Sequence, residues 1–423
     1  MAKGESLVQR LRRPRPLLRA IAELVNALNG LRPLSRNGFF TIPVFWFGWH
    51  TSELPTLYLT ASVLDSIRRG RRGDFAGARG KFALALTGAA WAVLTTIYVR
   101  GVTTPGRVLT AALRDGLGTD YADVVATLPS APSRAGWPSG VLRTSRIRHR
   151  YVSREDTVRY GPHRANVADV WRKRDLPRDG KAPVLVQVPG GGWVIGMRRP
   201  QAYPLMSHMA DRGWVCVSLG YRVAPVHTWP DHIVDVKRAL AWVRENIADY
   251  GGDPDFIAIT GGSAGGHLAS LAALTPNDEG WQPGFEEADT SVVAAAPLYG
   301  RYDWYSTPSR ARREFIGFLE KFVVKKSFES DRQVFVDASS IARVHSDAPP
   351  FFVLHGENDT VIPVEEARDF VRELRGVAQA PVLYAELPHA QHAFEMYGSP
   401  RAYQTAEAVA HFLSWVYAKT RDS

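Results

Sequence analysis

A strand that runs into a glycine-rich turn around one serine constrains this chain more than any other feature. Residues 256–260 are apolar or β-branched, residues 261–266 read Gly-Gly-Ser-Ala-Gly-Gly, and small and apolar residues then follow at helical spacing. This pattern predicts a strand, a sharp turn and a helix, with Ser263 at the bend. Glycines beside the serine let strand and helix approach closely while the hydroxyl projects from the backbone. A plain strand-to-helix loop has similar composition, so partners for Ser263 must decide between the two interpretations.

Segments with strand character alternate with helical segments on both sides of this turn. The alternation predicts an α/β fold with a mostly parallel central sheet, right-handed crossovers and helices on both faces. We expect residues 146–423 to form this catalytic domain. Strands are expected at 183–188, 214–219, 256–260, 292–296, 351–354 and 382–386, short edge strands at 148–152 and 167–171, and helices near 200–211, 231–250 and 401–419.

The segment 299–347 interrupts the alternation and is rich in aromatic and basic side chains. We expect it to form a helical cap that lines an acyl pocket. A pair of surface helices without a role in the pocket is the alternative.

Two later residues supply what a serine nucleophile needs. A hydroxyl requires a base within hydrogen-bond reach, and the base requires an acid that orients it. Asp359 and His392 each follow a predicted strand, and the order Ser, Asp, His is the one expected of an α/β-hydrolase. We therefore predict a catalytic triad of Ser263, Asp359 and His392.

Neighbouring residues compete for two of these roles. His389 lies three residues before His392, and Glu357 lies two residues before Asp359. We favour His392 because the apolar pair Ala393-Phe394 follows it directly, and Asp359 because it ends the pattern His-Gly-x-x-Asp.

A run of three glycines, residues 190–192, follows the buried strand predicted at 183–188. Glycines there allow backbone N–H groups to face a cavity, as an oxyanion hole requires. A flexible glycine loop is the alternative.

The composition excludes several classes of function. No Cys- or His-rich spacing typical of metal ligands is found, so we expect no metal, and His267 and His355 are expected to be structural. The one cysteine, Cys216, lies in an apolar strand and is expected to be buried. The formal net charge is +10, but no nucleic-acid-binding motif accompanies it, so nucleic acid is not expected as a partner.

The first 145 residues differ from the rest and carry much of the excess positive charge. Residues 1–36 hold eight Lys or Arg against two Glu, apolar stretches follow at 39–64 and 82–99, and a basic loop at 68–81 separates them. The second stretch, 18 residues without a charge, is near the lower limit for a membrane span. No cleavable signal peptide is evident. Residues 101–145 contain several Pro and Gly and are expected to be a connector.

Charge distribution limits how these stretches could meet a membrane. If both spanned, the basic N-terminus and the basic loop would lie on opposite sides. A single span at 82–99, or two segments lying in the interface, fits better, and a single span places the catalytic domain on the outer face. We expect membrane or cell-envelope association. The alternative is a cytoplasmic protein in which buried helices form a lid on the catalytic core.

Several motifs together resemble one family. The catalytic region, about 145–420, resembles the hormone-sensitive-lipase-like bacterial carboxylesterases of the α/β-hydrolase superfamily. The resemblance implies hydrolysis of short- to medium-chain carboxylic esters through an acyl-enzyme, without a cofactor. It also implies that the N–H groups of Gly191, Gly192 and Ala264 form the oxyanion hole. The motifs are Gly190-Gly191-Gly192-Trp193, Tyr221-Arg222-x-Ala224-Pro225, Gly261-Gly262-Ser263-Ala264-Gly265-Gly266, His355-Gly356-x-x-Asp359 and His392-Ala393-Phe394.

Two positions depart from the family pattern. Pro189 stands where the family usually has His, and Gly262 stands where it usually has Asp. Neither departure affects the triad, but both bear on substrate preference. Amidase, peptidase or deacetylase action on the same triad, and a non-catalytic ligand-binding homologue, remain alternatives.

Overall fold

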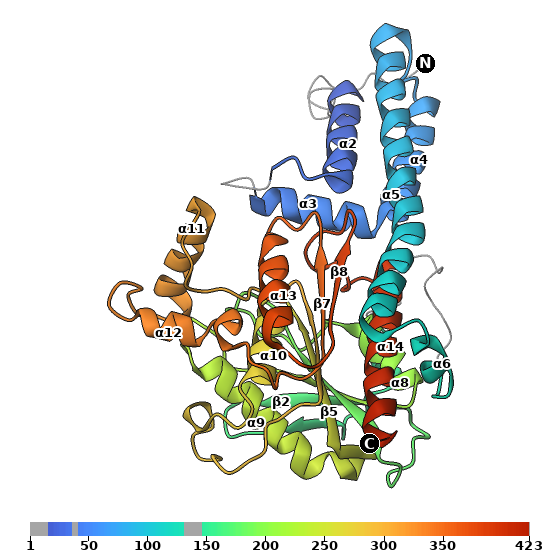
Figure 1. Ribbon diagram of the computed structural model, residues 1–423. Helices are drawn as coiled ribbons and strands as arrows, with labels where there is room; N and C mark the ends of the chain where they lie inside the picture. Colours follow the sequence, from blue (N-terminus) through green and yellow to red (C-terminus); the bar gives the residue numbers. More distant parts are fainter. Residues whose placement is uncertain (1–15, 36–40, 131–145, 423) are drawn as a thin grey trace.

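An eight-stranded, mostly parallel sheet lies at the centre of the protein in the computed structural model, which describes residues 16–35, 41–130 and 146–422 (Figure 1). Its strand order is β1-β2-β4-β3-β5-β6-β7-β8. The β1–β2 and β2–β4 pairs are antiparallel and all other pairs are parallel. The strands are β1 (Thr157–Arg159), β2 (Val167–Trp171), β3 (Ala182–Val188), β4 (Val215–Leu219), β5 (Gly252–Gly262), β6 (Ala294–Leu298), β7 (Phe351–Gly356) and β8 (Val382–Leu387).

Helices cover both faces of this sheet, so its central strands are buried along their whole length and are mostly apolar. One face is covered by α9, α10 and α13, and the other by α8, α14 and the second half of α5 (Gly77–Leu117). The arrangement confirms the predicted α/β-hydrolase fold. The helices are α8 (Tyr203–Asp211), α9 (Asp231–Asn246), α10 (Ala264–Leu274), α13 (Glu365–Val377), α14 (Pro400–Asp422) and the short η2 (Ile247–Tyr250) and η3 (Glu279–Trp281).

A helical insertion lies between β6 and β7, at the position predicted for a cap. Two of its aromatic side chains, Tyr302 and Trp304, are completely buried against the catalytic core. Its elements are α11 (Arg310–Phe318), η4 (Leu319–Val323), α12 (Arg332–Asp337) and η5 (Ser340–Arg343).

The prediction of an edge strand at 148–152 is wrong. Residues 148–150 form a 3-10 turn, η1 (Arg148–Arg150), and β1 occupies the edge of the sheet instead. The Arg148 side chain is directed inward, where its Nε donates to Asp169 Oδ2 at 3.1 Å. Asp169 also binds Arg199, so a buried ion-pair cluster replaces the alternation of a strand.

The prediction that residues after 100 form a connector is also wrong. Helix α5 (Gly77–Leu117) runs through Pro105, and α6 (Tyr121–Ala126) follows it; residues 131–145 lie outside the described structure. A proline inside a helix frees the carbonyl four residues earlier. That carbonyl belongs to Gly101, and the side-chain amide of Gln404 on α14 donates to it at 3.5 Å and to the Val102 carbonyl at 2.9 Å. Helix α5 therefore continues through Pro105 because a side chain of α14 satisfies the carbonyl that the proline leaves free.

The N-terminal helices project from the catalytic body, with the long helix α5 reaching furthest (Figure 1). Helix α2 starts at the far end, where Arg69 donates to the Pro16 carbonyl at 3.2 Å, and ends at the body, where Asn358 donates to the Leu31 carbonyl at 3.1 Å. Helix α4 runs back outward, α5 returns, and α3 lies across the body. The helices are α2 (Pro16–Leu31), α3 (Thr41–Glu53) and α4 (Pro55–Arg71).

Candidate active site

Ser263 occupies the turn between β5 and α10, as the sequence predicts. Its φ of 59° is in the left-handed region, which a residue with a β-carbon adopts only under constraint. The constraint is close packing, because a β-carbon on Gly261 would lie 2.4 Å from the Gly265 carbonyl oxygen, and one on Gly265 would lie 2.1 Å from the Val188 carbonyl oxygen. These glycines are therefore required by the turn.

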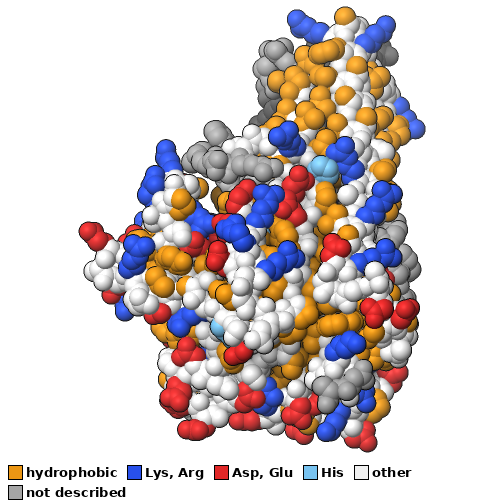
Figure 2. All heavy atoms as spheres, viewed as in Figure 1, with side chains coloured by type: hydrophobic (Ala, Val, Ile, Leu, Met, Phe, Trp, Pro, Cys, Tyr) orange, Lys and Arg blue, Asp and Glu red, His pale blue; other side chains and the backbone are white. Residues whose placement is uncertain are grey.

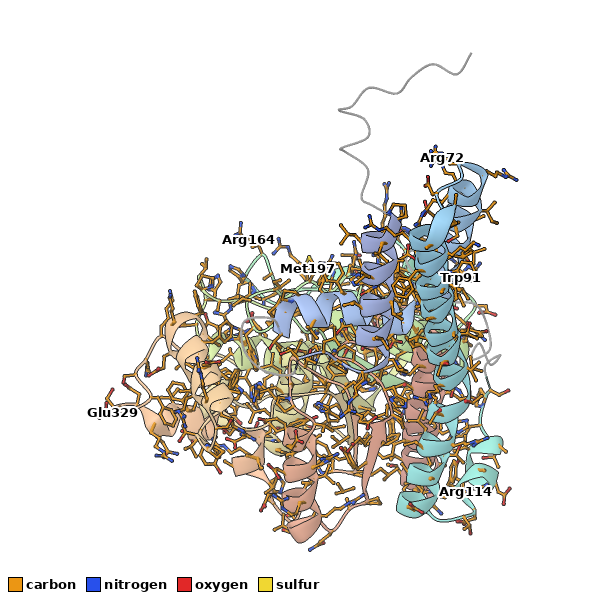
Figure 3. All side chains as sticks on the ribbon, turned by 90° about the horizontal axis from the view of Figure 1, so that it is seen from above. Arg72, Trp91, Arg114, Arg164, Met197 and Glu329 are labelled. Carbon is orange, nitrogen blue, oxygen red and sulfur yellow. The ribbon has the colours of Figure 1, made fainter. Side chains whose placement is uncertain are left out.

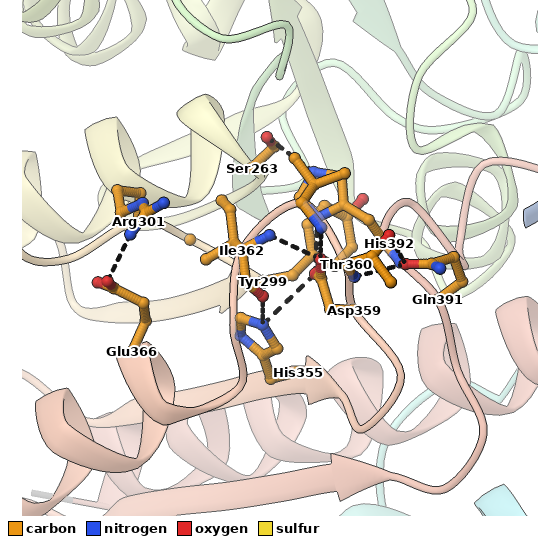
Figure 4. Close-up of polar contacts among 12 residues, drawn as sticks. Ser263, Tyr299, Arg301, His355, Asp359, Thr360, Ile362, Glu366, Gln391 and His392 are labelled. Carbon is orange, nitrogen blue, oxygen red and sulfur yellow. Dashed lines mark hydrogen bonds and ion pairs between the residues drawn. The ribbon is translucent and has the colours of Figure 1, made fainter. Parts of the chain in front are cut away.

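The structure brings Ser263, His392 and Asp359 into one hydrogen-bonded chain (Figure 4). His392 Nε2 lies 2.9 Å from Ser263 Oγ, and His392 Nδ1 lies 2.6 Å from Asp359 Oδ2. A carboxylate only accepts hydrogen bonds, so Nδ1 carries the proton and Nε2 accepts from the serine hydroxyl. This is the geometry in which a histidine can remove the serine proton.

Asp359 is fully buried and surrounded by donors. Its Oδ1 accepts from the backbone N–H groups of Val361 and Ile362, each at 2.8 Å, and His355 Nε2 lies 3.4 Å from Oδ2. Burial by itself would raise the pKa of this carboxyl, but His392, His355 and the hydrogen bonds hold it well below its usual range. Asp359 is therefore ionised at neutral pH. His355, predicted to be structural, also touches this carboxylate.

The competing residues His389 and Glu357 pair with each other instead of with Ser263. The His389 backbone N–H donates to Glu357 Oε2 at 2.9 Å, and its ring Nδ1 lies 3.7 Å from the same oxygen. The ring Nε2 faces Arg100 at 3.3 Å. Both side chains are directed to the surface beside α5.

The glycine loop after β3 packs directly against the serine turn. A β-carbon on Gly190 would lie 2.6 Å from the Gly262 carbonyl oxygen and 3.1 Å from Ser263 Cβ. The Tyr221 hydroxyl donates to the Pro189 carbonyl at 3.0 Å, and Gln201 both accepts from the Gly190 N–H at 2.7 Å and donates to its carbonyl at 3.1 Å. These two side chains brace a loop whose first residue, a proline, has no side-chain hydrogen bond of its own.

Tyr299 is a site residue that the sequence did not reveal. It follows β6, and its ring lies 4.6 Å from the His392 ring. Its hydroxyl donates to the buried carboxyl of Glu395, and burial raises the pKa of both groups. A β-carbon on Gly262 would lie 2.5 Å from the Tyr299 hydroxyl oxygen. Position 262 is therefore a glycine because Tyr299 fills the space beside it. The glycine in place of the family's usual Asp was the one feature of the sequence that could have indicated a large neighbouring side chain.

His267 is structural, as predicted. The Trp193 indole N–H donates to His267 Nδ1 at 3.2 Å, so Nε2 carries the proton and donates to the Ala338 carbonyl at 2.6 Å. Burial lowers the pKa of His267 to about 3, so the ring is neutral. It links the glycine loop to the cap. Within the described residues, no group of three or more His, Cys, Asp or Glu side chains could hold a metal ion.

The sheet topology, the strained serine turn and the Ser-His-Asp chain together define an α/β-hydrolase with a serine-hydrolase site. Solved structures agree on the fold. An esterase of Thermogutta terrifontis with bound butyrate matches 61% of this chain and 92% of its own at a TM-score of 0.53 and 24% identity. A carbohydrate esterase from gut microbiota covers 64% of this chain and 98% of its own at a TM-score of 0.51 and 20% identity.

Sequence relatives identify the family. The BD-FAE family matches residues 174–374. The probable carboxylic ester hydrolase LipM of Mycobacterium tuberculosis is 47% identical over 97% of this chain and 95% of its own. Esterase LipC of the same organism is 50% identical over 73% of this chain and 75% of its own. The chain belongs to the bacterial carboxylesterases of the α/β-hydrolase superfamily, and it is a carboxylic ester hydrolase.

Proposed function

We propose that Ser263 is the nucleophile, His392 the general base and acid, and Asp359 the residue that orients His392. The observation that carries this proposal is the unbroken hydrogen-bonded chain from Ser263 Oγ to the buried Asp359 carboxylate. Ser263 Oγ attacks the ester carbonyl carbon while His392 Nε2 takes its proton and then gives it to the leaving alcohol. A water molecule activated by the same nitrogen then hydrolyses the acyl-enzyme.

The oxyanion of each tetrahedral intermediate is held, in this proposal, by the N–H groups of Gly191, Gly192 and Ala264. Ala264 is the first residue of α10, so its N–H lies at a helix N-terminus, where negative charge is favoured. The glycine loop packs so closely on the serine turn that a β-carbon on Gly190 would lie 3.1 Å from Ser263 Cβ, which supports its role as the other donor element.

The proposed substrates are carboxylic esters with short to medium acyl chains. Aromatic side chains from the glycine loop and the cap meet beside the site: Trp193 lies 4.7 Å from Trp304 and 6.1 Å from Phe315, measured between ring centroids. In the proposed division of the chain, residues 146–423 form the catalytic domain, and the 299–347 insertion is its cap, which we propose lines the acyl pocket.

Hydrolysis of a series of p-nitrophenyl esters, from acetate to palmitate, tests these roles. We expect the highest kcat/KM at short to medium chains, and no turnover by a folded Ser263→Ala variant. Paired His392→Ala and His389→Ala variants identify the base, because only the first is expected to lose activity. Retained turnover by Ser263→Ala, or loss confined to His389→Ala, contradicts the assignment.

We also propose that the N-terminal helices embed in a lipid bilayer. Large apolar side chains cover the outer faces of these helices, whereas a small apolar cluster (Ala27, Ala90, Leu94 and Ile97) and several polar pairs lie between them. Arg19 on α2 pairs with Asp65 on α4 at 3.2 Å, and Asp65 also lies 3.8 Å from Arg69 one turn along α4. The Trp91 indole on α5 donates to Ser62 on α4 at 2.9 Å. Most exposed large hydrophobic side chains of the described residues belong to this region: Leu18, Ile21, Val25, Leu28, Leu34, Ile42, Trp46, Phe47, Leu57, Leu64, Ile67, Phe82, Leu84 and Val99.

Figure 2 shows hydrophobic side chains over this projection and basic side chains at its far end. Helix α5 is long and apolar enough to cross a membrane by length and composition. Residues 77–99, which precede the Arg100 contact with the body, extend roughly 34 Å, against about 30 Å for a hydrocarbon core.

The helix directions support one orientation. Pro16 lies beside Arg69, so the start of α2 and the basic α4–α5 loop share the far end, where Figure 3 labels Arg72. The sequence before Pro16 is also basic. With three segments, α2, α4 and α5, crossing in alternate directions, both basic stretches lie on the same side of the membrane. Because positive charge is retained on the cytoplasmic side, that side is the cytoplasm. The catalytic body then faces the outside of the cell membrane, in the envelope.

Membrane fractionation of the full chain tests this placement. We expect the protein to remain in the membrane pellet after an alkaline carbonate wash, and Phe82→Asp on α5 to release a larger soluble fraction. Val226→Asp, at an exposed apolar position of the catalytic body, serves as the matched control and should change nothing. Complete release of the unmodified chain by carbonate contradicts embedding.

A further inference from the structure

Helix α3 lies directly over the loop between β8 and α14, which carries His392 (Figure 1). The triad itself does not require this placement of α3. The Phe45 ring meets the His392 ring edge to face at 5.9 Å and stacks on Trp49 at 5.5 Å. Trp49 in turn stacks on Tyr397 at 4.8 Å. A row of aromatic side chains thus connects the N-terminal helices to the residues around the catalytic histidine.

One hydrogen bond in this row reaches the backbone next to His392. The buried indole N–H of Trp49 donates to the carbonyl of Ala393 at 2.8 Å. Ala393 has a φ of 59°, a left-handed conformation that is costly for a residue with a β-carbon. Such a conformation persists only where the surroundings hold it, and Trp49 holds the carbonyl of that same residue.

The end of α3 is anchored to the same segment by a buried charge. Glu53 is 1% exposed; it binds Arg401, and its Oε2 accepts from the Ser399 hydroxyl at 2.8 Å. One turn earlier, His50 Nε2 lies 2.9 Å from the Tyr397 hydroxyl. Residues 393–401, which join the histidine loop to α14, are therefore attached to α3 at several points.

We propose that Trp49 is a positioning residue for His392, so that α3 is part of what makes the hydrolase active. The inference rests on the proposed role of His392 as the base. Asp359 and Gln391 hold the histidine loop from the sheet side, and Trp49 holds it from the opposite side by fixing the Ala393 carbonyl. Without the indole N–H, Ala393 can relax and the His392 ring leaves its alignment with Ser263.

The test removes the N–H and keeps an aromatic ring at position 49. Trp49→Phe, and replacement of Trp49 by its isostere 3-benzothienylalanine, are measured with a soluble p-nitrophenyl ester in detergent. We expect kcat to fall on the order of 10-fold with little change in KM. The rate of inactivation by a fluorophosphonate, which needs a Ser263 activated by His392, should fall by the same factor.

Trp91→Phe is the matched control, because Trp91 also lies in the N-terminal helices and also loses an indole hydrogen bond, to Ser62. It should lower the melting temperature about as much as Trp49→Phe and leave kcat unchanged. If Trp49→Phe does not fold, the isostere, which preserves shape, decides the question.

Two failures are distinguishable. Full kcat and full fluorophosphonate reactivity in a folded Trp49 variant overturn the positioning role while Ser263→Ala remains inactive. Activity in Ser263→Ala overturns the proposed function itself.

Discussion

Gly262→Ala is the substitution that most directly tests how the serine turn is packed. Gly262 has no positive φ, so an alanine is acceptable to the backbone and its cost is steric. The new β-carbon would lie 2.5 Å from the Tyr299 hydroxyl oxygen and 2.9 Å from two ring carbons. Ordinary contact requires about 3.5 Å, so these atoms must separate by about 1 Å. Tyr299 is buried and held by Glu395, so the ring cannot simply rotate away.

Two effects of this displacement are expected. Overpacking of a rigid site costs about 1–3 kcal/mol in the free energy of unfolding, which lowers the melting temperature by several degrees. Tyr299 also lies against the His392 ring, and a shift of about 1 Å at a reacting group can reduce the rate by up to about 100-fold. We therefore expect kcat/KM for a p-nitrophenyl ester to fall by between 10- and 100-fold.

Calorimetry and ester hydrolysis on four variants measure both effects. Tyr299→Phe removes the nearest atom, so Gly262→Ala should cost less stability in that background than in the unmodified chain. Gly376→Ala is the control: it lies in α13 with nothing within 4 Å of the added β-carbon, and should be neutral or stabilising by up to about 1 kcal/mol. A Gly262→Ala enzyme as stable and as active as the unmodified one refutes the reasoning, as does an equal cost in both backgrounds.

Three further predictions follow from buried charges and protons. The folded-state pKa of His267, about 3, lies below the unfolded value of about 6.5, so the stability that this neutral ring provides is present above pH 6.5 and is lost as the pH falls towards 3. Denaturant titrations between these pH values should show the free energy of unfolding falling by up to about 1.4 kcal/mol per pH unit, and by less in His267→Gln. A stability difference between the two proteins that does not change with pH would refute this prediction. Glu53→Ala leaves Arg401 buried and unpaired and should destabilise the chain by about 3–5 kcal/mol, whereas Glu53→Met combined with Arg401→Met should recover most of the loss, and equal unfolding midpoints for both would contradict it. Asp359→Asn should lower kcat by about 10⁴-fold at neutral pH with the fold intact by circular dichroism, and a loss of less than 10-fold would show that Asp359 does not orient His392.

The parts of the site that depend on local sequence were predictable. The serine turn needs glycines at fixed positions next to the nucleophile, and Asp359 and His392 each follow a strand of a parallel sheet, whose carboxyl ends meet at one edge. These constraints act within a few residues of each group. Pattern analysis therefore located all three, and it preferred His392 over His389, which in the structure faces Arg100.

Residues that reach the site from distant segments were not predictable. Trp49 contacts a carbonyl more than 300 residues away, and nothing in its local sequence indicates that partner. Tyr299 follows a strand, as the serine does, but its effect is visible only in the absence of a side chain at Gly262. A single sequence indicates periodicity and turn chemistry. It indicates a contact between two distant residues only where one of them is unusually small or large for its position.

Tertiary contacts also explain the errors in secondary structure. Pro105 indicated the end of a helix, but Gln404 supplies the hydrogen bond that the proline leaves unmade. The sequence placed the residues of α2 only within a basic, hydrophobic helical N-terminal region, and it did not show which of their side chains face outward. In the structure Arg19 pairs with Asp65 on α4, and the large apolar residues Leu18, Ile21, Val25 and Leu28 are exposed. Hydropathy averaged along the chain does not show this separation of faces.

Covalent labelling of the nucleophile tests the central claim most directly. The full-length protein is incubated with a fluorophosphonate, digested, and analysed by mass spectrometry. The hydrogen-bonded chain through His392 predicts one adduct per molecule, on Ser263, with loss of esterase activity in proportion to labelling, and no adduct in Ser263→Ala. A stoichiometric adduct on another residue, or full esterase activity in the labelled protein, would contradict it.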